Sequence, residues 1–420
     1  MIWLFFLCNL LARASAGPLT LDGAIQRGMQ NNPSLEKAKE SLAVAQAKSW
    51  ETLATYSPKV LINASHSIDE KYLTMPFGAM RIPATTPKTF ASVGAYLTLF
   101  DGLQGWHNHQ ATEKQTEVAS LEYSRAQQQT ESEIRTAFYR TLGTNLLVEV
   151  NQQSVTALKD HLAKTQQTLQ RGVSTKFDML RVQVQLEEAE SELLRAQDQY
   201  TIALRQLSNA MGEESAEWGP QGEFPEPTIL TDAEEKEWRK RQSVDTKTSL
   251  LKAEAADYNS LAANGTYLPK INFYAEQQYY NTDTHGLTDH YYDAYGVGFN
   301  LSWPIFDFAL ISRNRAQAHL ADESAALARE LHLRSLGEEE NWFRQLRYSA
   351  TQYQAKKRAL ESASEEFRLA KIGFTAGSYT NSQVLDAQVD VTRAKAGILR
   401  AQIDNREALG KLEAMFGRNK

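Results

Sequence analysis

Few residues in the sequence have the types and spacing of a metal site. His107 and His109 open a long helical pattern, and histidines and aspartates also gather in the loop 281–290. Side chains two residues apart in a helix diverge by about 200°, so this histidine pair cannot share a metal ion. The loop residues could bind a cation, but a polar loop explains them equally well. We therefore predict no metal site.

The sequence also lacks the motifs that carry common catalytic chemistry. It has no glycine-rich phosphate loop, no serine nucleophile elbow and no zinc-binding His-Glu-x-x-His helix. Carboxylates are frequent in its helical patterns, where charged residues mostly form solvated faces. We expect no catalytic residue and no cofactor, and we do not expect an enzyme.

The composition limits the compartment and the partners. The 420 residues carry a formal net charge of −6, so no basic excess indicates a nucleic-acid partner. Residues 1–16 form an apolar run ending in Ala14-Ser15-Ala16, which is typical of a secretory signal peptide; a buried N-terminal helix is the alternative. The only cysteine, Cys8, lies in this segment, so we expect an exported chain without thiols.

The sequence contains one pattern twice, at an offset of about 205 to 211 residues. The segment YSPKV, from Tyr56, recurs as YLPKI, from Tyr267. Further repeated positions are Gly172, Thr175 and Leu180, which recur as Gly377, Thr380 and Leu385. A register kept over so many places predicts a tandem duplication, with a first repeat at 17–211, a connector or equatorial segment at 212–244 and a second repeat at 245–420.

Each repeat is predicted to hold a helix, two strands and a long helical hairpin. In the first repeat we expect a helix over about 20–55, interrupted at Asn31-Asn32-Pro33, and strands over about 58–70 and 89–100, joined by a proline-containing loop. No proline occurs from 102 to 170, where helix-favouring residues dominate. A break at 172–175 then precedes a returning helix over about 176–210, and the second repeat breaks at 375–378.

The segment YGVGFNLSWPIFD, residues 295–307, alternates between two faces. Its apolar face includes Val297, Phe299, Leu301 and Trp303. Alternation with a period of two indicates a strand, and each predicted strand has about 10–12 residues, the length of a tilted transmembrane β-strand. An antiparallel sheet with one face on a soluble core is the alternative.

Four membrane strands cannot close by themselves, because membrane barrels begin at about eight strands. Open edges in hydrocarbon would leave backbone groups unpaired, at a cost of several kcal/mol each. The missing strands must then come from other copies. Two copies give eight strands and a filled interior, whereas three give twelve strands and a lumen, so three are favoured.

These motifs together resemble the TolC family of outer-membrane efflux proteins. The similarity covers essentially the whole mature chain and includes LTLDGAIQRGMQNNPSLEKAKESLAVAQA, YSPKV and YLPKI, LTLFDG and LSWPIFD, and RGVSTKFDML and AGSYTNSQVLDAQVD. The resemblance implies a mainly α fold with β: a homotrimer whose twelve-stranded outer-membrane β-barrel, four strands per chain, continues as a long periplasmic α-helical barrel. It implies a passive exit channel for a tripartite efflux pump or type I secretion system, with a periplasmic adaptor and an inner-membrane transporter as partners.

The resemblance also implies roles for the two hairpin breaks. The family's hairpin ends contact the adaptor, and here they correspond to Arg171, Gly172, Val173, Ser174, Ala376, Gly377 and Ser378. Plain turn chemistry is the alternative, since glycine at a helix end supplies a left-handed cap.

A second implied site is the periplasmic gate. The family often has two aspartates one helical turn apart in the second repeat; Asp386 matches one, while Gln383 stands at the other and Asp178 is its equivalent in the first repeat. Tyr379 stands where the family's gate arginine usually lies. Three copies of Asp386 around one axis would attract cations. A solvated helical carboxylate is the alternative.

Two other classes of protein compete with the channel. An elongated coiled-coil structural or adhesin-like envelope protein would account for the charged helices but not for four alternating strands. A soluble periplasmic binding or hydrolytic protein would require a compact core with convergent polar groups, which the pattern does not indicate. The exported substrate cannot be read from the sequence.

Overall fold

A computed structural model describes residues 18–66, 68, 73–77, 80–84, 89–172, 174–214, 218–281 and 291–417. The predicted signal peptide, Val173 and nearly all of the loop 281–290 lie outside these residues. The chain divides into two units. One comprises Met1–Glu40, Leu121–Lys247 and His332–Lys420, and the other comprises Ser41–Ser120 and Thr248–Leu331.

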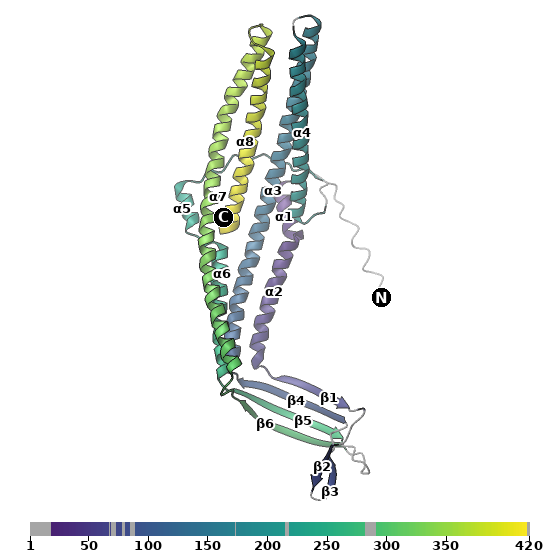
Figure 1. Ribbon diagram of the computed structural model, residues 1–420, viewed down its shortest axis with the longest axis vertical. Coiled ribbons are helices and arrows are strands. Elements are labelled where there is room, and N and C mark those ends of the chain that lie inside the picture. Colours follow the sequence, from purple (N-terminus) through teal and green to yellow (C-terminus); the bar gives the residue numbers. More distant parts are fainter. Residues whose placement is uncertain are drawn as a thin grey trace. The chain divides into compact units, whose positions relative to one another are not determined.

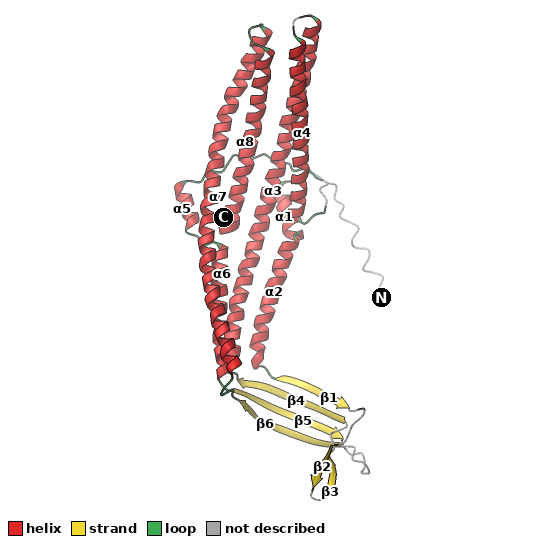
Figure 2. Ribbon diagram, viewed as in Figure 1, coloured by secondary structure: helices red, strands yellow, loops and turns green. Residues whose placement is uncertain are grey.

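The first half of the chain contains α1 (Leu21–Asn31), α2 (Pro33–Leu53), α3 (Gln104–Gln170) and α4 (Lys176–Met211). The second half contains α6 (Val244–Asn264), α7 (Phe308–Thr375) and α8 (Asn381–Phe416). Helices α2, α3 and α4 of the first half recur in the same order as α6, α7 and α8 of the second half (Figures 1 and 2). The returning helices α4 and α8 have 36 residues each, as a duplication predicts. None of the described helices combines the length and the apolar composition required to cross a membrane.

The predicted interruption near the start of the first half is confirmed. Helix α1 ends at Asn31 and α2 begins at Pro33, where a proline costs no hydrogen bond. Between them, the side-chain amide of Asn32 donates to the carbonyl of Ala210 at 2.8 Å. This bond fastens the break to the end of α4.

The second unit contains a four-stranded antiparallel sheet of order β1-β4-β5-β6. Its strands are β1 (Lys59–His66), β4 (Thr89–Phe100), β5 (Lys270–Asn281) and β6 (Tyr291–Ser302). The two repeats meet at the β4–β5 pair, where Tyr96 lies opposite Tyr274. In the described sheet, β1 and β6 each pair on one side only. Strand β1 covers Lys59–His66 of the predicted 58–70, and residues 67, 69 and 70 of that range lie outside the described residues.

The loop predicted between the first two strands instead holds a small hairpin, β2 (Leu73–Phe77) and β3 (Met80–Ala84). Pro76 lies opposite Arg81, and Pro83 lies opposite Thr74. Proline cannot donate to a ladder, and this argued against strands here. In a two-stranded ribbon both strands are edges, so a proline can face the unpaired side.

The two faces of the sheet differ as the alternation predicts. Val297, Phe299 and Leu301 are all more than half exposed, and Phe299 is 70 % exposed. On the opposite face, tyrosine rings cover glycines: a Cβ added to Gly94 would lie 2.8 Å from the hydroxyl of Tyr96. One face is therefore bare and apolar, and the other is filled with tyrosine and polar side chains.

The connector between the repeats packs in the first unit. Its helix α5 (Asp232–Arg239) buries Trp238 against Phe343 and Phe416. Asn405, fully buried on α8, accepts from the backbone N–H of Thr228 at 2.7 Å and donates to the carbonyl of Thr228 at 3.1 Å. The connector is thus held on α7 and α8, although the predicted repeat boundaries stay predictions.

Candidate functional site

The two hairpin ends are built alike. We call α3 with α4 hairpin 1, and α7 with α8 hairpin 2; Figure 1 shows both. Gly172 and Gly377 have φ angles of 75° and 73°, which confirms the predicted left-handed caps. A Cβ at either position would meet nothing within 4 Å, so glycine is favoured here by backbone conformation and not by crowding.

The predicted adaptor-contacting residues lie at these ends. Arg171, Gly172, Ala376, Gly377 and Ser378 are exposed and Ser174 is half-buried, whereas Val173 lies outside the described residues. In hairpin 1 the hydroxyls of Thr168 and Ser174 are 2.6 Å apart. In hairpin 2 the hydroxyl of Ser378 donates to the carbonyl of Gly373 at 3.1 Å. Serine therefore closes both turns onto the preceding helix.

Asp178 and Gln383 are helix-capping residues. The backbone N–H of Thr175 donates to the Asp178 carboxylate at 3.1 Å, and the N–H of Asp178 donates back to the Thr175 hydroxyl at 3.1 Å. This reciprocal pair of hydrogen bonds is a capping box. Thr380 and Gln383 form another at the start of α8, where the N–H of Thr380 donates to the Gln383 side chain at 2.8 Å. Aspartate and glutamine can both occupy this position of a capping box, because the position requires only a side-chain oxygen that accepts a hydrogen bond.

Tyr379 folds back on the last turn of α7. Its backbone N–H donates to the carbonyl of Gly373 at 3.2 Å. A Cβ on Gly373 would lie 2.6 Å from the Tyr379 ring, so only glycine leaves space for it. The ring is partly exposed at the end of hairpin 2.

The start of α8 fits between the helices of hairpin 1. Asn381 is buried; its side-chain oxygen lies 2.5 Å from Nε2 of His161 on α3, and its amide donates to the carbonyl of Asp178 on α4 at 3.4 Å. Burial lowers the pKa of His161; the bond to Asn381 opposes this shift, and the charge of Lys164 adds to it. The imidazole is therefore predominantly neutral at pH 7 in this contact.

One turn further along α8, Asp386 meets a cation that the sequence analysis did not single out. Its carboxylate lies 3.7 Å from the guanidinium of Arg181 on α4 and accepts a bond of 3.2 Å from the Ser382 hydroxyl. Asp386 nevertheless remains 68 % exposed. Arg181 occupies the position of the first repeat that is equivalent to Asp386. Opposite charges at equivalent positions were the signal that could have identified it.

Beneath these polar contacts the two hairpins share an apolar cluster. Leu385 is 1 % exposed and packs on residues of α3 and α4, namely Val155, Leu158, Val182 and Leu186. The contact between hairpins within one chain therefore combines a buried leucine, an imidazole–amide hydrogen bond and an ion pair.

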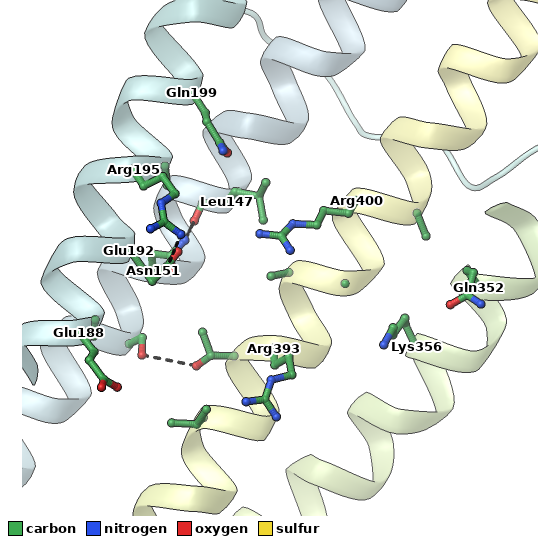
Figure 3. A pocket seen from close by; sticks show the side chains of 18 of the residues that line it. Leu147, Asn151, Glu188, Glu192, Arg195, Gln199, Gln352, Lys356, Arg393 and Arg400 are labelled. Carbon is green, nitrogen blue, oxygen red and sulfur yellow. Dashed lines mark hydrogen bonds and ion pairs between the residues drawn. The ribbon is translucent and has the colours of Figure 1, made fainter. Parts of the chain in front are cut away.

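A groove of about 660 Å³, lined by both charged and apolar side chains, follows the same contact farther from the hairpin ends (Figure 3). Helix α8 contributes Arg393 and Arg400, α7 contributes Lys356, and α4 contributes Glu188 and Glu192. Charges of both signs suit water and ions better than an apolar ligand. Among the described residues, no three histidine, cysteine or acidic side chains gather as a metal-binding group.

The predicted lipid-facing residues lie on the bare face of the sheet and just beyond it. Val297, Phe299 and Leu301 project from β6, and Trp303 follows it, with its indole donating to the carbonyl of Tyr267 at 3.0 Å. Large exposed apolar side chains continue into the start of α7 at Ile305, Phe306 and Phe308. An apolar surface of this kind is suited to lipid or to another protein.

Two known bacterial proteins are similar to this chain over most of its length. The alkaline protease secretion protein AprF of Pseudomonas aeruginosa is 21 % identical over 425 residues, covering 99 % of this chain and 88 % of AprF. The outer membrane protein TolC of Escherichia coli K12 is 22 % identical over 413 residues, covering 92 % of this chain and 81 % of TolC.

Solved structures share the fold. The outer-membrane channel OprN matches with a TM-score of 0.80 at 18 % identity, covering 95 % of this chain and 90 % of OprN. The outer membrane protein VceC of Vibrio cholerae matches with a TM-score of 0.77 at 17 % identity, covering 94 % of this chain and 96 % of VceC. The family model for outer membrane efflux proteins matches residues 24–213 and again residues 242–418. With both repeats matched, the chain belongs to the outer membrane efflux protein family.

Proposed function

We propose that three copies of this chain form one passive exit channel, which carries substrates from an inner-membrane transporter across the periplasm and the outer membrane. The observation that carries the proposal is the four-stranded sheet, with one bare apolar face and with β1 and β6 unpaired on their outer sides in the described chain. The polar tyrosine-rich face would line the lumen.

Pairing between copies removes the cost of the sheet edges. Each unpaired backbone group in hydrocarbon costs several kcal/mol, so a single chain cannot insert its sheet. Strand β6 of one copy would pair with β1 of the next, and three copies would close a barrel of twelve strands. A barrel of eight strands would be filled by side chains, whereas twelve leave a water-filled passage.

The hairpin ends are the proposed docking surface for a periplasmic adaptor protein. Their described residues are exposed apart from half-buried Ser174, capping boxes fix the helix starts beside them, and a glycine and a serine occur in each turn. AprF is named for secretion of alkaline protease, and the family is named for efflux. A passive tube serves either system, and the transporter selects the cargo.

Asp386, Gln383, Tyr379 and Asp178 are proposed to surround the periplasmic entrance. Support comes from their position at the starts of α4 and α8 and from the exposure of the Asp386 carboxylate. Asp178 and Gln383 would fix the local backbone by capping, and Asp386 would supply charge. We propose no catalytic residue and no cofactor.

Conductance tests the channel directly. The purified chain in detergent should have the mass of three copies by native mass spectrometry, and planar bilayers containing it should show discrete conductance steps. A folded monomer, or a folded trimer that never conducts, would contradict the proposal. A coiled-coil structural protein would give neither barrel insertion nor conductance.

The Asp386→Asn variant tests the entrance. Removing the carboxylate should weaken the block of current by multivalent cations added on the side of the hairpin ends, because fewer negative charges would hold them. Asp390→Asn, four residues further along α8 and paired with Arg393, is the matched control. In an Arg181→Gln background, where no guanidinium lies beside the carboxylate, an Asp386→Asn change that leaves the block unaltered would remove Asp386 from the lumen.

A further inference from the structure

We propose that Arg181 and Asp386 alternate around the channel entrance, with each Asp386 between Arg181 of its own chain and Arg181 of a neighbouring copy whose α4 lies against hairpin 2 as α8 lies against hairpin 1. This inference rests on the proposed trimer and specifies how its hairpins meet. The partner is identified by the internal repeat. Gly172 and Thr175 correspond to Gly377 and Thr380, and α4 and α8 have equal lengths from these points.

The first support is an apolar residue without cover. Leu385 of α8 is buried in a socket on hairpin 1, but its equivalent on α4, Leu180, is 47 % exposed in the single chain. On hairpin 2 the positions equivalent to this socket hold Leu360, Ala363, Ala387 and Val391. All four are apolar; Ala363 and Ala387 are already buried, whereas Leu360 and Val391 are half-buried and keep accessible surface. Leu180 of the neighbouring copy would pack on Leu360 and Val391.

The second support is charge complementarity. Within one chain, His161 contacts Asn381. The equivalent residues are Glu366 on α7 and Lys176 on α4, which carry opposite charges and are exposed. Neither forms an ion pair within the described chain. Seating α4 of one copy on hairpin 2 of the next would bring this lysine and this glutamate together.

The third support is the pair of Arg181 and Asp386, which are equivalent to each other. Inside one chain, Arg181 on α4 lies 3.7 Å from Asp386 on α8. Repeating the contact between copies places Arg181 of the neighbouring copy on the other side of Asp386, which is 68 % exposed and has space for it. Three copies then give six alternating charges at one level.

The alternating ring changes the expected electrostatics of the entrance. Three bare carboxylates would repel one another and hold cations. Three carboxylates that each lie between two guanidinium groups would be neutralised and would bind cations weakly. Arg181 would thus be the residue that sets how strongly the entrance retains cations.

Cysteine cross-linking tests the seating. In a Cys8→Ser background the chain has no other cysteine, so Lys176→Cys with Glu366→Cys introduces one defined pair. A short bis-methanethiosulfonate linker applied to the detergent-solubilised trimer should join the copies into dimers and trimers on denaturing, non-reducing gels. His161→Cys with Asn381→Cys should be joined within one chain, without an increase in mass.

The matched negative control is Lys176→Cys with Arg368→Cys, since Arg368 lies two residues from Glu366 and points about 200° away around α7. Linked oligomers from the Glu366 pair but not from the Arg368 pair would support the seating. A trimer by native mass spectrometry that yields no linked oligomers would overturn the seating and leave the channel proposal intact. A folded chain that is monomeric by native mass spectrometry would overturn both.

The ring is tested by current block in planar bilayers with hexaamminecobalt(III). Arg181→Gln should strengthen the block at least about tenfold, and Arg181→Gln with Asp386→Asn should return it to the unmodified level or below. An Arg181→Gln channel that conducts with an unchanged block would overturn the ring. Arg195→Gln, an arginine of α4 paired with Glu192, is the control substitution and should leave the block unchanged.

Discussion

At the scale of single residues, His161 gives the contact between the hairpins a dependence on pH. Burial lowers the pKa of this imidazole below its usual value of 6.5, so the folded chain favours the neutral form. A histidine whose pKa is lower in the folded chain than in the unfolded chain makes its full contribution to folding stability at pH values above the unfolded-state pKa. That stability is lost as the pH falls from about 6.5 toward the folded-state pKa, because the unfolded chain then binds the proton more readily.

We therefore expect the melting temperature of the detergent-solubilised protein to fall as the pH is lowered through 6.5, and to fall less in His161→Gln. Glutamine keeps an amide donor toward Asn381 and cannot be protonated in this range. His319→Gln is the control, because His319 is exposed on α7. Equal pH slopes for His161→Gln and the unmodified protein would contradict the assignment.

Asn405 is a second residue with a specific structural task. It is fully buried. Its side-chain amide forms hydrogen bonds with the backbone N–H and carbonyl of Thr228 and with the hydroxyl of Ser349. Asn405→Ala should destabilise the protein by about 1–3 kcal/mol, since a buried N–H loses its partner. Thermal unfolding should show this, whereas Asn341→Ala, on the exposed surface of α7, should unfold like the unmodified protein.

At the scale of elements, periodicity and breakers predicted most of the fold. The proline-free run to Gln170, the glycine breaks and the alternating strands correspond to α3, the hairpin turns and β4, β5 and β6. The β2–β3 hairpin was missed because prolines argue against a central strand but not against an isolated ribbon. The contact of Arg181 with Asp386 was missed because it depends on how two hairpins pack, which the pattern of one helix does not contain.

The bare face of β6 leads to a prediction about membrane insertion. Phe299→Arg would place a charge on the proposed lipid-facing side, at a cost of up to about 2–4 kcal/mol near the bilayer centre. Asn300→Arg, the adjacent residue on the other face, would point into the lumen. Heat-modifiable migration of outer-membrane fractions should show less folded protein for Phe299→Arg and near-normal amounts for Asn300→Arg. Equal losses would argue against a lipid-facing Phe299.

At the scale of the whole molecule, the duplication determines what one chain can do alone. The pairing of β4 with β5 joins the repeats in a single sheet, but the same arrangement leaves one outer strand from each repeat, β1 and β6, for other copies. The sequence predicted this incompleteness from strand count. It did not predict which side chains at the start of α8 contact hairpin 1.

The side chains that join the hairpins have a consequence for how such an assembly would loosen. Both contacts share an ion pair of Arg181 with Asp386, but the contact inside a chain adds an imidazole–amide hydrogen bond, whereas the proposed contact between copies adds an exposed lysine and glutamate. Dissolved salt weakens exposed ion pairs, with a screening length of about 8 Å at 0.15 M, but it has less effect on the hydrogen bond of a half-buried neutral imidazole. Acid would then weaken the contacts within each chain, and salt would weaken most the contacts between copies. A cylinder of six hairpins could therefore widen in two different ways.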